Sequence, residues 1–247
     1  LLDKDFLKPQ AFHEFPVTRS GGIAAIISLS IFFIIYDLLY SKILYDYILI
    51  SYSVFLLGFL DDLRINIKPL NRLITMIFLL FLSIYFLPIK ILNIDIPFLT
   101  SLMSNHIFSS IFVLLCFLFV INGANLIDGF NGLLTINLII INIILSYINI
   151  NNDNLEFSIL IISQIIVLLS FLLFNFPSAK IFLGDSGAYT MGALVGLNTI
   201  ITNNLNPTIS SFFFCTLLFY LFFEVFFSFF RNLSCLGESN CKRTALA

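Results

Sequence analysis

The residues of this chain best suited to chemistry are four aspartates: Asp61, Asp62, Asp128 and Asp185. Each of them lies in a short polar break at the end of a long apolar run. A carboxylate at the boundary of a membrane is costly, and is usually kept for function or for an ion partner. Four such carboxylates, predicted on one side of a membrane, indicate a site for a cation and a phosphorylated ligand.

The first polar break carries two adjacent carboxylates, Asp61 and Asp62. Adjacent carboxylates repel each other, so at least one is expected to be held ionised by a cation or to have a raised pKa. This arrangement suits either the binding of Mg²⁺ or the uptake of a proton. The alternative is a solvated helix end, with Arg64, Lys68 and Arg72 as its neighbours, and both interpretations stay open.

The second polar break shows a regular polar pattern. Asn125, Asp128 and Asn131 recur at every third residue, which brings them near one face if the segment is helical. The three glycines of the same break allow a backbone to approach a ligand closely. A simple turn between helices would not need this pattern, which therefore favours a function.

The third break ends in Asp185 and Ser186, which immediately precede an apolar run and are expected to be the N-cap of its helix. Since a helix N-terminus favours anions, an aspartate beside it could hold Mg²⁺ against a pyrophosphate. Near the start of the chain, Arg19 is a candidate phosphate ligand, because a guanidinium forks onto oxyanions. Taken alone, Arg19 also fits an ordinary cytoplasmic charge.

The composition indicates the setting of these residues. Hydrophobic residues make up 60% of the 247 residues and charged residues 11%, against about 25% charged in soluble domains. The mean hydropathy is +1.05. The chain is therefore predicted to be a polytopic membrane protein, and it has no basic or aromatic-basic stripe that would indicate nucleic-acid binding.

A membrane-spanning helix needs about 20 mainly apolar residues. Eight apolar runs approach this length and predict an all-α bundle of about eight transmembrane helices. They are Gly22–Tyr40, Ile43–Leu60, Leu73–Leu87, Ile107–Ile121, Leu133–Ile150, Phe157–Phe174, Ala188–Ile201 and Ile209–Phe230. The segment Ile91–Leu99 is too short to span and is expected to be an interfacial strand or hairpin.

The distribution of positive charge predicts the orientation. Of the twelve Lys and Arg residues, ten fall on one side of these spans and two, Lys42 and Lys90, on the other. By the positive-inside rule, both termini and all four aspartates are then cytoplasmic. We expect a membrane-embedded domain over residues 1–231, followed by an atypical polar tail over residues 232–247.

Four motifs in order identify a family. They are His13–Gly22, Gly58–Leu63, Asn125–Leu133 and Phe182–Gly187. Together they make the chain resemble the polyprenyl-phosphate N-acetylhexosamine-1-phosphate transferases, or glycosyltransferase family 4, which include the phospho-MurNAc-pentapeptide transferases and the enzymes that start O-antigen synthesis. The resemblance implies a Mg²⁺-dependent phosphotransferase that moves a sugar-1-phosphate from a UDP-N-acetylhexosamine to undecaprenyl phosphate and releases UMP.

The resemblance also implies roles for residues of this chain. It assigns Mg²⁺, with Mn²⁺ as the alternative ion, to Asp185, and it puts Asp61 and Asp62 at the lipid phosphate as catalytic residues, one of them as a base. The residues expected to bind nucleotide or substrate are Arg19, Asn125, Asp128, Asn131 and Phe182. Where Asn131 stands, the family often has a second aspartate.

The family further implies a multi-pass protein of the bacterial inner (plasma) membrane. Its active site would be cytoplasmic. The reaction would start the synthesis of a cell-envelope polysaccharide, such as the cell wall or the lipopolysaccharide O-antigen. A homodimer is an open alternative. Family members usually have a helix before His13 and a His-containing loop after Arg231, and neither is found in this sequence. A chain truncated at both ends, and an inactive fragment, therefore stay open. A transporter is less favoured, because its acids would be distributed through the depth of the bilayer.

Overall fold

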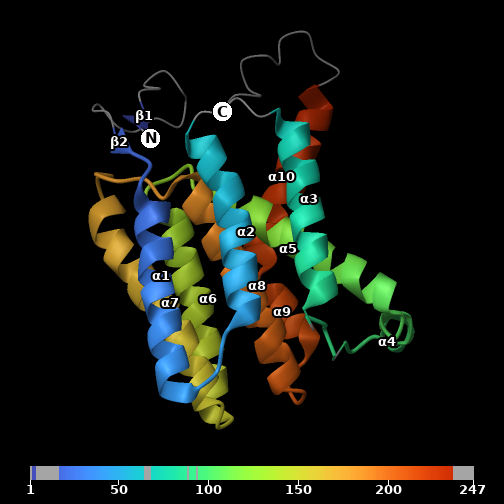
Figure 1. Cartoon of the computed structure of the whole chain (residues 1–247). Helices are drawn as coiled ribbons and strands as arrows, with labels where there is room; N and C mark the ends of the chain where they lie inside the picture. Colours follow the sequence, from blue (N-terminus) through green and yellow to red (C-terminus); the bar gives the residue numbers. More distant parts are fainter. Residues whose placement is uncertain (1, 4–16, 64–67, 88, 93, 236–247) are drawn as a thin grey trace.

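The structure, a computed structural model, describes residues 2–3, 17–63, 68–87, 89–92 and 94–235 (Figure 1). Within them, the chain is an all-α bundle with one short pairing of two strands, so the predicted fold class is confirmed. The elements are β1 (Leu2–Asp3), β2 (Val17–Thr18), α1 (Gly21–Tyr40), α2 (Tyr45–Asp62), α3 (Pro69–Phe86), α4 (Pro97–Met103), α5 (His106–Ile127), α6 (Leu133–Asn151), α7 (Leu155–Asn175), α8 (Gly184–Leu205), α9 (Ser211–Leu217) and α10 (Phe219–Cys235). Most of the predicted tail 232–247, and the start of the first motif, lie outside the described residues, so the domain boundary stays a prediction.

Five of the described helices are long and apolar enough to cross a membrane: α1, α3, α5, α6 and α7. The pair α9 and α10 makes a sixth span if it is counted as one bent helix. The two remaining expected runs correspond to α2 and α8, which are 18 and 22 residues long but less apolar. The chain is therefore a multi-pass membrane protein, and the direction in which it crosses the membrane stays a prediction.

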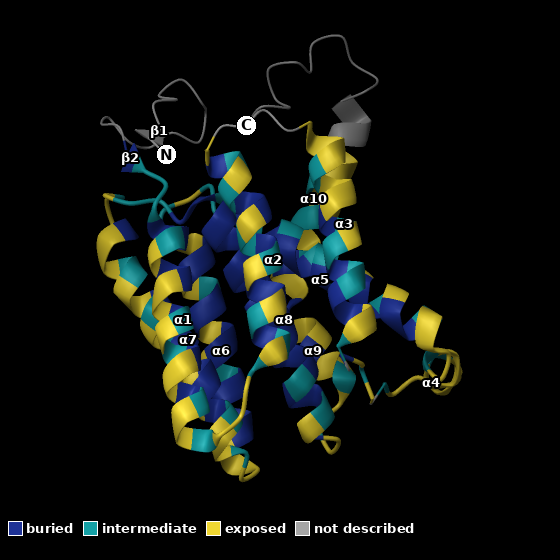
Figure 2. Cartoon of the chain, viewed as in Figure 1, coloured by how far each residue is buried: buried dark blue, intermediate teal, exposed yellow. Residues whose placement is uncertain are grey.

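Helix α8 forms the centre of the bundle. It contacts α1, α2, α5 and α6, and it is buried along nearly its whole length, whereas the outer helices expose apolar faces (Figure 2). A helix that faces protein on all sides does not need a lipid-compatible surface. This explains why α8 extends beyond its expected apolar run, Ala188–Ile201, at both ends.

A buried group of polar side chains joins α8 to three neighbouring helices. The Asn198 side chain accepts a hydrogen bond from the Tyr47 hydroxyl (2.7 Å) and donates to Gln164 (2.7 Å) and Asn142 (3.0 Å). All four residues are at most 3% exposed. Because no water is present in the bilayer core, polar groups there must find partners within the protein. These bonds therefore fix α8 against α2, α6 and α7.

The last expected span, Ile209–Phe230, is broken rather than continuous. Its two halves, α9 and α10, are bent by 60°. The Thr216 hydroxyl donates to the carbonyls of Phe212 and Phe213, a side-chain bond to the preceding turn that often bends helices. The apolar run predicted the span but not its bend, because no proline or glycine in this stretch signals the break.

Two glycines allow helices to approach through their backbones. A Cβ at Gly58 would lie 2.5 Å from the carbonyl carbon and oxygen of Asp185, and a Cβ at Gly123 would lie 2.3 Å from the carbonyl oxygen of Leu221. Small residues permit this kind of contact between membrane helices. Gly58 sets how closely α2 lies to the start of α8, and Gly123 does the same for α5 and α10.

We predict that Gly58→Ala destabilises the protein by about 2 kcal/mol or more, because the added methyl group must push α2 away from α8. The matched control is Gly196→Ala on α8, where a Cβ would meet ring atoms of Phe117 at 3.5 Å, an ordinary contact. The control should be neutral or slightly stabilising, since alanine favours helix over glycine by up to about 1 kcal/mol. Unfolding temperatures in detergent measure both, and equal effects would contradict the close backbone contact.

Candidate functional site

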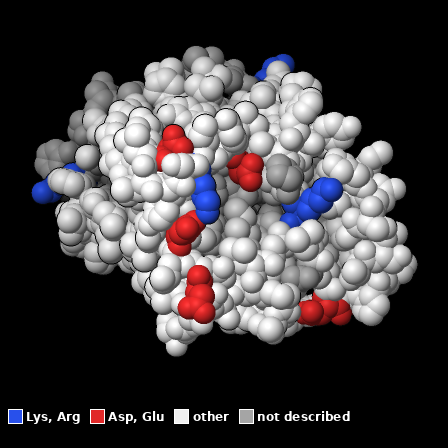
Figure 3. All heavy atoms as spheres, turned by 60° about the horizontal axis from the view of Figure 1, so that its bottom comes forward, with Lys and Arg blue, Asp and Glu red and all other residues white. Residues whose placement is uncertain are grey.

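Three helices bring the predicted aspartates to one end of the bundle. Helix α2 ends at Asp62, α5 ends immediately before Asp128, and α8 begins one residue before Asp185 (Figure 1). Because α8 runs opposite to α2 and α5, its beginning meets their ends. At the opposite end of the molecule, charged side chains are scattered over a mostly uncharged surface (Figure 3), with an ion pair between Lys42 and Glu156 among them. The expected gathering of the four aspartates is therefore found.

Asp62 is the most deeply buried of the four, with 1% of its surface exposed. Its Oδ1 accepts a hydrogen bond from the backbone N–H of Asp185 (3.0 Å), and its Oδ2 accepts from the backbone N–H (3.0 Å) and the hydroxyl (2.6 Å) of Ser186. The sequence-based assignment of Asp185 and Ser186 as the N-cap of α8 was wrong. The N-cap position is Leu183, which makes no side-chain cap, so Asp62 takes that role from another helix.

Arg72, in the first turns of α3, joins two of the aspartates. Its Nη1 lies 2.7 Å from Oδ2 of Asp61 and 3.6 Å from Oδ2 of Asp185. The guanidinium also lies over the ring of Tyr189, 5.9 Å from the centroid, in a cation–π arrangement. Sequence reasoning treated Arg72 only as a solvated neighbour, and the one signal that could have found it was its position just after the Asp61 motif.

Burial and mutual repulsion shift the acidity of the gathered carboxylates. Burial, followed by the nearby Asp62, raises the pKa of Asp185 to about 6, while Arg19 and Arg72 act in the opposite direction. Burial, followed by the charge of Asp185, raises the pKa of Asp128 well above its usual range, and Arg19 again lowers it. Such shifts in a group of carboxylates are typical of functional sites.

Arg19 is brought into the same group by the segment that precedes α1. Its Nη1 lies 4.0 Å from Oδ1 of Asp62. The backbone around it is fixed by hydrogen bonds to the segment before α8: the N–H of Phe182 donates to the carbonyl of Thr18 (2.8 Å), and the N–H of Gly21 donates to the carbonyl of Phe182 (3.0 Å). Arg19 and Phe182, which belong to different sequence motifs, therefore lie on adjoining segments at the edge of the site.

The two predicted asparagines are placed differently from the aspartates. Helix α5 ends at Ile127, so the segment is not helical as far as Asn131, and the condition for a face shared with Asn125 and Asp128 is not met. Asn125 is half-buried, one turn before Asp128 on α5, whereas the Asn131 side chain donates to the carbonyl of Pro177 (3.3 Å). Asn131 thus faces the segment that leads to α8 rather than the carboxylates.

Asn175 belongs to none of the four sequence motifs, but it organises two segments of the site. Its Oδ1 accepts from the N–H of Gly132 (2.6 Å) and its Nδ2 donates to the carbonyl of Ile181 (3.0 Å). Gly132 has a φ of +76°, a conformation that glycine adopts without strain. The side chain therefore holds the turn after Asp128 against the segment before α8, and only the structure reveals this role.

The donor chemistry of the site fits Mg²⁺. Within the described part of the chain, no three His, Cys, Asp or Glu residues lie close enough together to form a complete metal cage. Mg²⁺ does not need one, because it keeps several waters and is usually held by one or two carboxylates together with substrate phosphates. Asp185, with Asp61 as its neighbour across Arg72, offers hard oxygen ligands of this kind.

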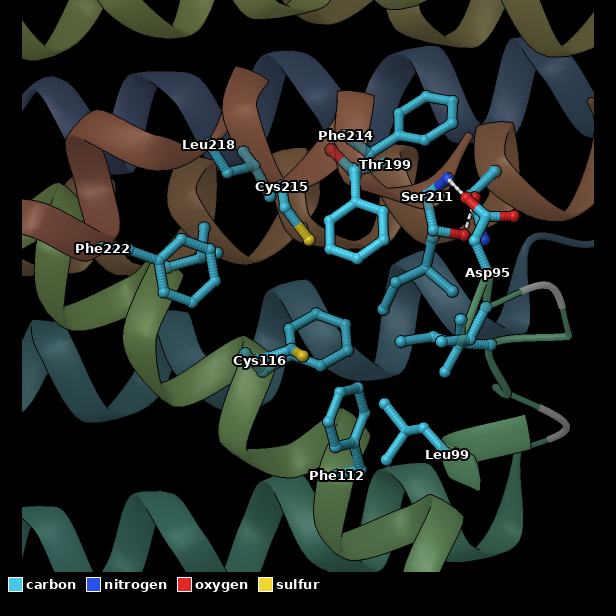
Figure 4. A pocket seen from close by; sticks show the side chains of 18 of the residues that line it. Asp95, Leu99, Phe112, Cys116, Thr199, Ser211, Phe214, Cys215, Leu218 and Phe222 are labelled. Carbon is cyan, nitrogen blue, oxygen red and sulfur yellow. Dashed lines mark hydrogen bonds between the residues drawn. The ribbon is translucent and has the colours of Figure 1, made fainter. Parts of the chain in front are cut away.

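A separate apolar cavity of about 260 Å³ lies toward the other end of the bundle, between α5, α8, α9, α10 and the segment 91–99. Figure 4 shows Cys116 and Cys215 on its facing walls, among aromatic side chains. Asp95, on its rim, accepts hydrogen bonds from the hydroxyl of Ser210 and the N–H of Ser211. Its walls suit hydrocarbon rather than phosphate, so a phosphorylated ligand would fit the aspartate end better than this cavity.

Comparison with known proteins decides the family. A family model described as glycosyl transferase family 4 matches residues 44–203, a range that contains α2, α5 and the start of α8. The chain belongs to this family. The relationship that the four motifs indicated is thus confirmed.

Several curated members of glycosyl transferase family 4 are similar to the chain. Proteins called phospho-N-acetylmuramoyl-pentapeptide-transferase are 35% identical over 152 residues in Clostridium perfringens strain 13 (58% of this chain, 48% of the relative), and 32% identical over 163 residues in Streptococcus thermophilus strain CNRZ 1066 (62% and 47%). The one from Orientia tsutsugamushi strain Ikeda is 32% identical over 221 residues (74% and 59%). The chain spans about half the length of these relatives.

The raised pKa of Asp185 predicts how stability depends on pH. The folded chain holds this proton up to a pKa of about 6, against 3.8 for an ordinary aspartate. The stability that this proton adds to the folded state is fully present below pH 3.8 and is lost as the pH rises through about 6. Asp185→Asn, which imitates the protonated form, should therefore be more stable than the parent by up to about 3 kcal/mol near neutral pH and equal to it in acid.

Thermal unfolding in detergent and a metal chelator, followed across this pH range, measures the difference. The control is Asp153→Asn, which alters an exposed aspartate with a φ of 60° in the turn between α6 and α7. The control should follow the parent at every pH. A constant offset between Asp185→Asn and the parent would contradict the raised pKa.

Proposed function

We propose that this chain carries the active site of a transferase that moves a sugar-1-phosphate from a UDP-N-acetylhexosamine to undecaprenyl phosphate. An oxygen of the lipid phosphate attacks the sugar-linked phosphorus of the donor. A new P–O bond forms, the bond to the bridging oxygen breaks, and UMP leaves with that oxygen. The family supports a transferase reaction of this general kind, and the site supports its chemistry.

The observation that carries the proposal is the arrangement of Asp185, Asp61 and Arg72, with Arg19 nearby, at the end of the bundle. Phosphoryl transfer depends mainly on positioning and on neutralising the charge of the phosphoryl oxygens. Arg19 and Arg72 can bind phosphate oxygens, because a guanidinium pairs with them in a bidentate way. Asp61 is set to orient the attacking phosphate through Arg72, and it need not act as a base, since a phosphate is already largely ionised at neutral pH.

Asp185 is the residue that would hold Mg²⁺, with Mn²⁺ as the alternative ion. When bound, the ion supplies neutralisation of the negative charge on the diphosphate of the donor. Two features support this assignment. The side chain of Asp185 is 26% exposed, whereas that of Asp61 is 11% exposed and that of Asp62 is fully buried. Among the described residues of the site, the carboxylates also outnumber the arginines. For the nucleotide we propose Asn125, Asp128 and Asn131, with Phe182 as the residue that stacks on uracil.

The setting of the reaction follows from its substrates. The lipid acceptor stays in the bilayer and the UDP-sugar is dissolved in the cytoplasm, so the two meet at the inner surface of a membrane. We therefore propose the bacterial inner membrane, with the aspartates on the cytoplasmic side, in agreement with the ten-to-two distribution of Lys and Arg. The names of the relatives favour the MurNAc-pentapeptide donor and cell-wall synthesis over O-antigen synthesis.

UMP release by membranes that carry the chain tests the proposal. The reaction would contain undecaprenyl phosphate, Mg²⁺ and either UDP-MurNAc-pentapeptide or UDP-GlcNAc. We expect Mg²⁺-dependent release with at least one donor, and Asp185→Asn should lower the rate by about a hundredfold or more, because the main ion ligand is lost. Asp153→Asn, at the opposite end of the bundle, should retain the rate of the parent.

Full activity of Asp185→Asn would contradict the metal assignment. No release with either donor, from a parent chain that unfolds cooperatively in detergent, would contradict the proposed activity for this chain. Because the chain spans about half of its relatives, the same assay with a family C-terminal segment joined after Arg231 distinguishes an inactive part of a transferase from a protein of another function.

A further inference from the structure

The two adjacent aspartates at the end of α2 face different surroundings. The side chain of Asp61 is 11% exposed and pairs with Arg72. The side chain of Asp62 is fully buried and faces the first turn of α8. The sequence motif therefore combines two carboxylates that cannot have the same function.

We propose that Asp62 is a positioning residue whose carboxylate caps α8 from α2 and thereby fixes Asp185 in the site. The role of Asp185 itself rests on the proposed function, whereas the cap does not. Asp62 is then neither a base nor a ligand of the substrate.

The hydrogen bonds of Asp62 support this role. An N-cap side chain normally accepts from the N–H groups of the second and third residues of its own helix. In α8 these residues are Asp185 and Ser186, and Asp62 accepts from both, at 3.0 Å each. The Ser186 hydroxyl adds a third bond at 2.6 Å. Both oxygens of Asp62 are thus engaged inside the protein, whereas a base must reach its substrate.

The backbone on both sides is shaped for the contact. Gly184 has a φ of +75°, and a Cβ there would lie only 2.7 and 2.8 Å from the two carboxylate oxygens of Asp62. One turn before Asp62, Gly58 allows α2 to touch the backbone of Asp185. Any side chain at either glycine would separate the carboxylate from the N–H groups that it binds.

The cap has a consequence for substrate binding. The N-terminus of a helix is often a binding site for anions, and this was the expectation for α8. Here the two N–H groups that would serve it are already bound to Asp62. The diphosphate must therefore be bound by side chains such as Arg19 and Arg72, and the contribution of α8 is to aim the Asp185 carboxylate.

Amide hydrogen exchange tests the cap without any substrate. In Asp62→Asn, the side-chain amide replaces one accepting oxygen by a donor, so the N–H groups of Asp185 and Ser186 should exchange about tenfold faster or more. Mass spectrometry of a peptide that covers residues 184–190 reports the change. The matched control is Asp61→Asn, which breaks the pair with Arg72 and should leave exchange in this peptide unchanged.

Ser186→Ala is a milder variant in case Asp62→Asn fails to fold. It removes only the 2.6 Å bond from the hydroxyl and should accelerate exchange in the same peptide to a smaller extent. Its control, Ser170→Ala, alters an exposed serine on α7 that donates only to its own helix, at the carbonyl of Ile166. Unchanged exchange in both Asp62→Asn and Ser186→Ala would overturn the cap.

Mn²⁺ binding, followed by electron paramagnetic resonance, separates positioning from base catalysis. If Asp62 positions Asp185, then Asp62→Asn and Ser186→Ala should both weaken Mn²⁺ binding, by about tenfold for the first, and excess metal should restore part of the UMP release. If Asp62→Asn binds Mn²⁺ as tightly as the parent but releases no UMP at any metal concentration, the positioning role is overturned. If the parent releases no UMP but amide exchange is still faster in Asp62→Asn, the cap is retained and only the proposed function is rejected.

Discussion

The backbone contact between the start of α8 and the helices α1 and α2 is the constraint on which the site depends. Besides Gly58 on α2, Gly22 on α1 allows this approach, since a Cβ there would lie 2.4 Å from the Ser186 hydroxyl oxygen. Because no side chains separate these helices, the carboxylate of Asp62 can reach N–H groups of α8. The same contact brings Arg19, which lies just before α1, to within 4.0 Å of Asp62. Two arginines and four aspartates from five segments thus share a small volume.

The charges in this volume do not balance among the described residues. Four carboxylates face two guanidinium groups, Arg19 and Arg72, and burial makes the surplus costly. A protein can reduce such a surplus by raising the pKa of some carboxylates, as it does for Asp128 and Asp185, or by binding a cation. A divalent ion would supply the two missing positive charges. The physical basis of the proposed Mg²⁺ site is therefore the charge of the whole group rather than a preformed cage of ligands.

Hydropathy and motif order predicted the membrane helices and the gathering of the aspartates, because both follow from local sequence and from the alternation of helix direction. The contacts that define the site could not be predicted in this way. Asp62 caps a helix that begins more than a hundred residues later, and Arg72 lies in a first turn that carries no motif. The end of α5 at Ile127 separates Asn131 from Asn125 despite their regular spacing. Each of these features depends on which helices are neighbours, which no single segment encodes.

The rigidity of the site comes from the way in which α8 is held along its length. Asp62 binds its first turn, and the Asn198 side chain binds three other helices near its middle. Near its end, the Thr202 hydroxyl accepts a bond from the buried Asn149 of α6 (2.9 Å). Inside the bundle, a polar group that loses its partner finds no water to bind in its place. Each of these bonds therefore resists the sliding or rotation of α8. A helix fixed at three levels can keep one carboxylate, that of Asp185, in a constant position, as the proposed reaction between a lipid and a nucleotide partner requires.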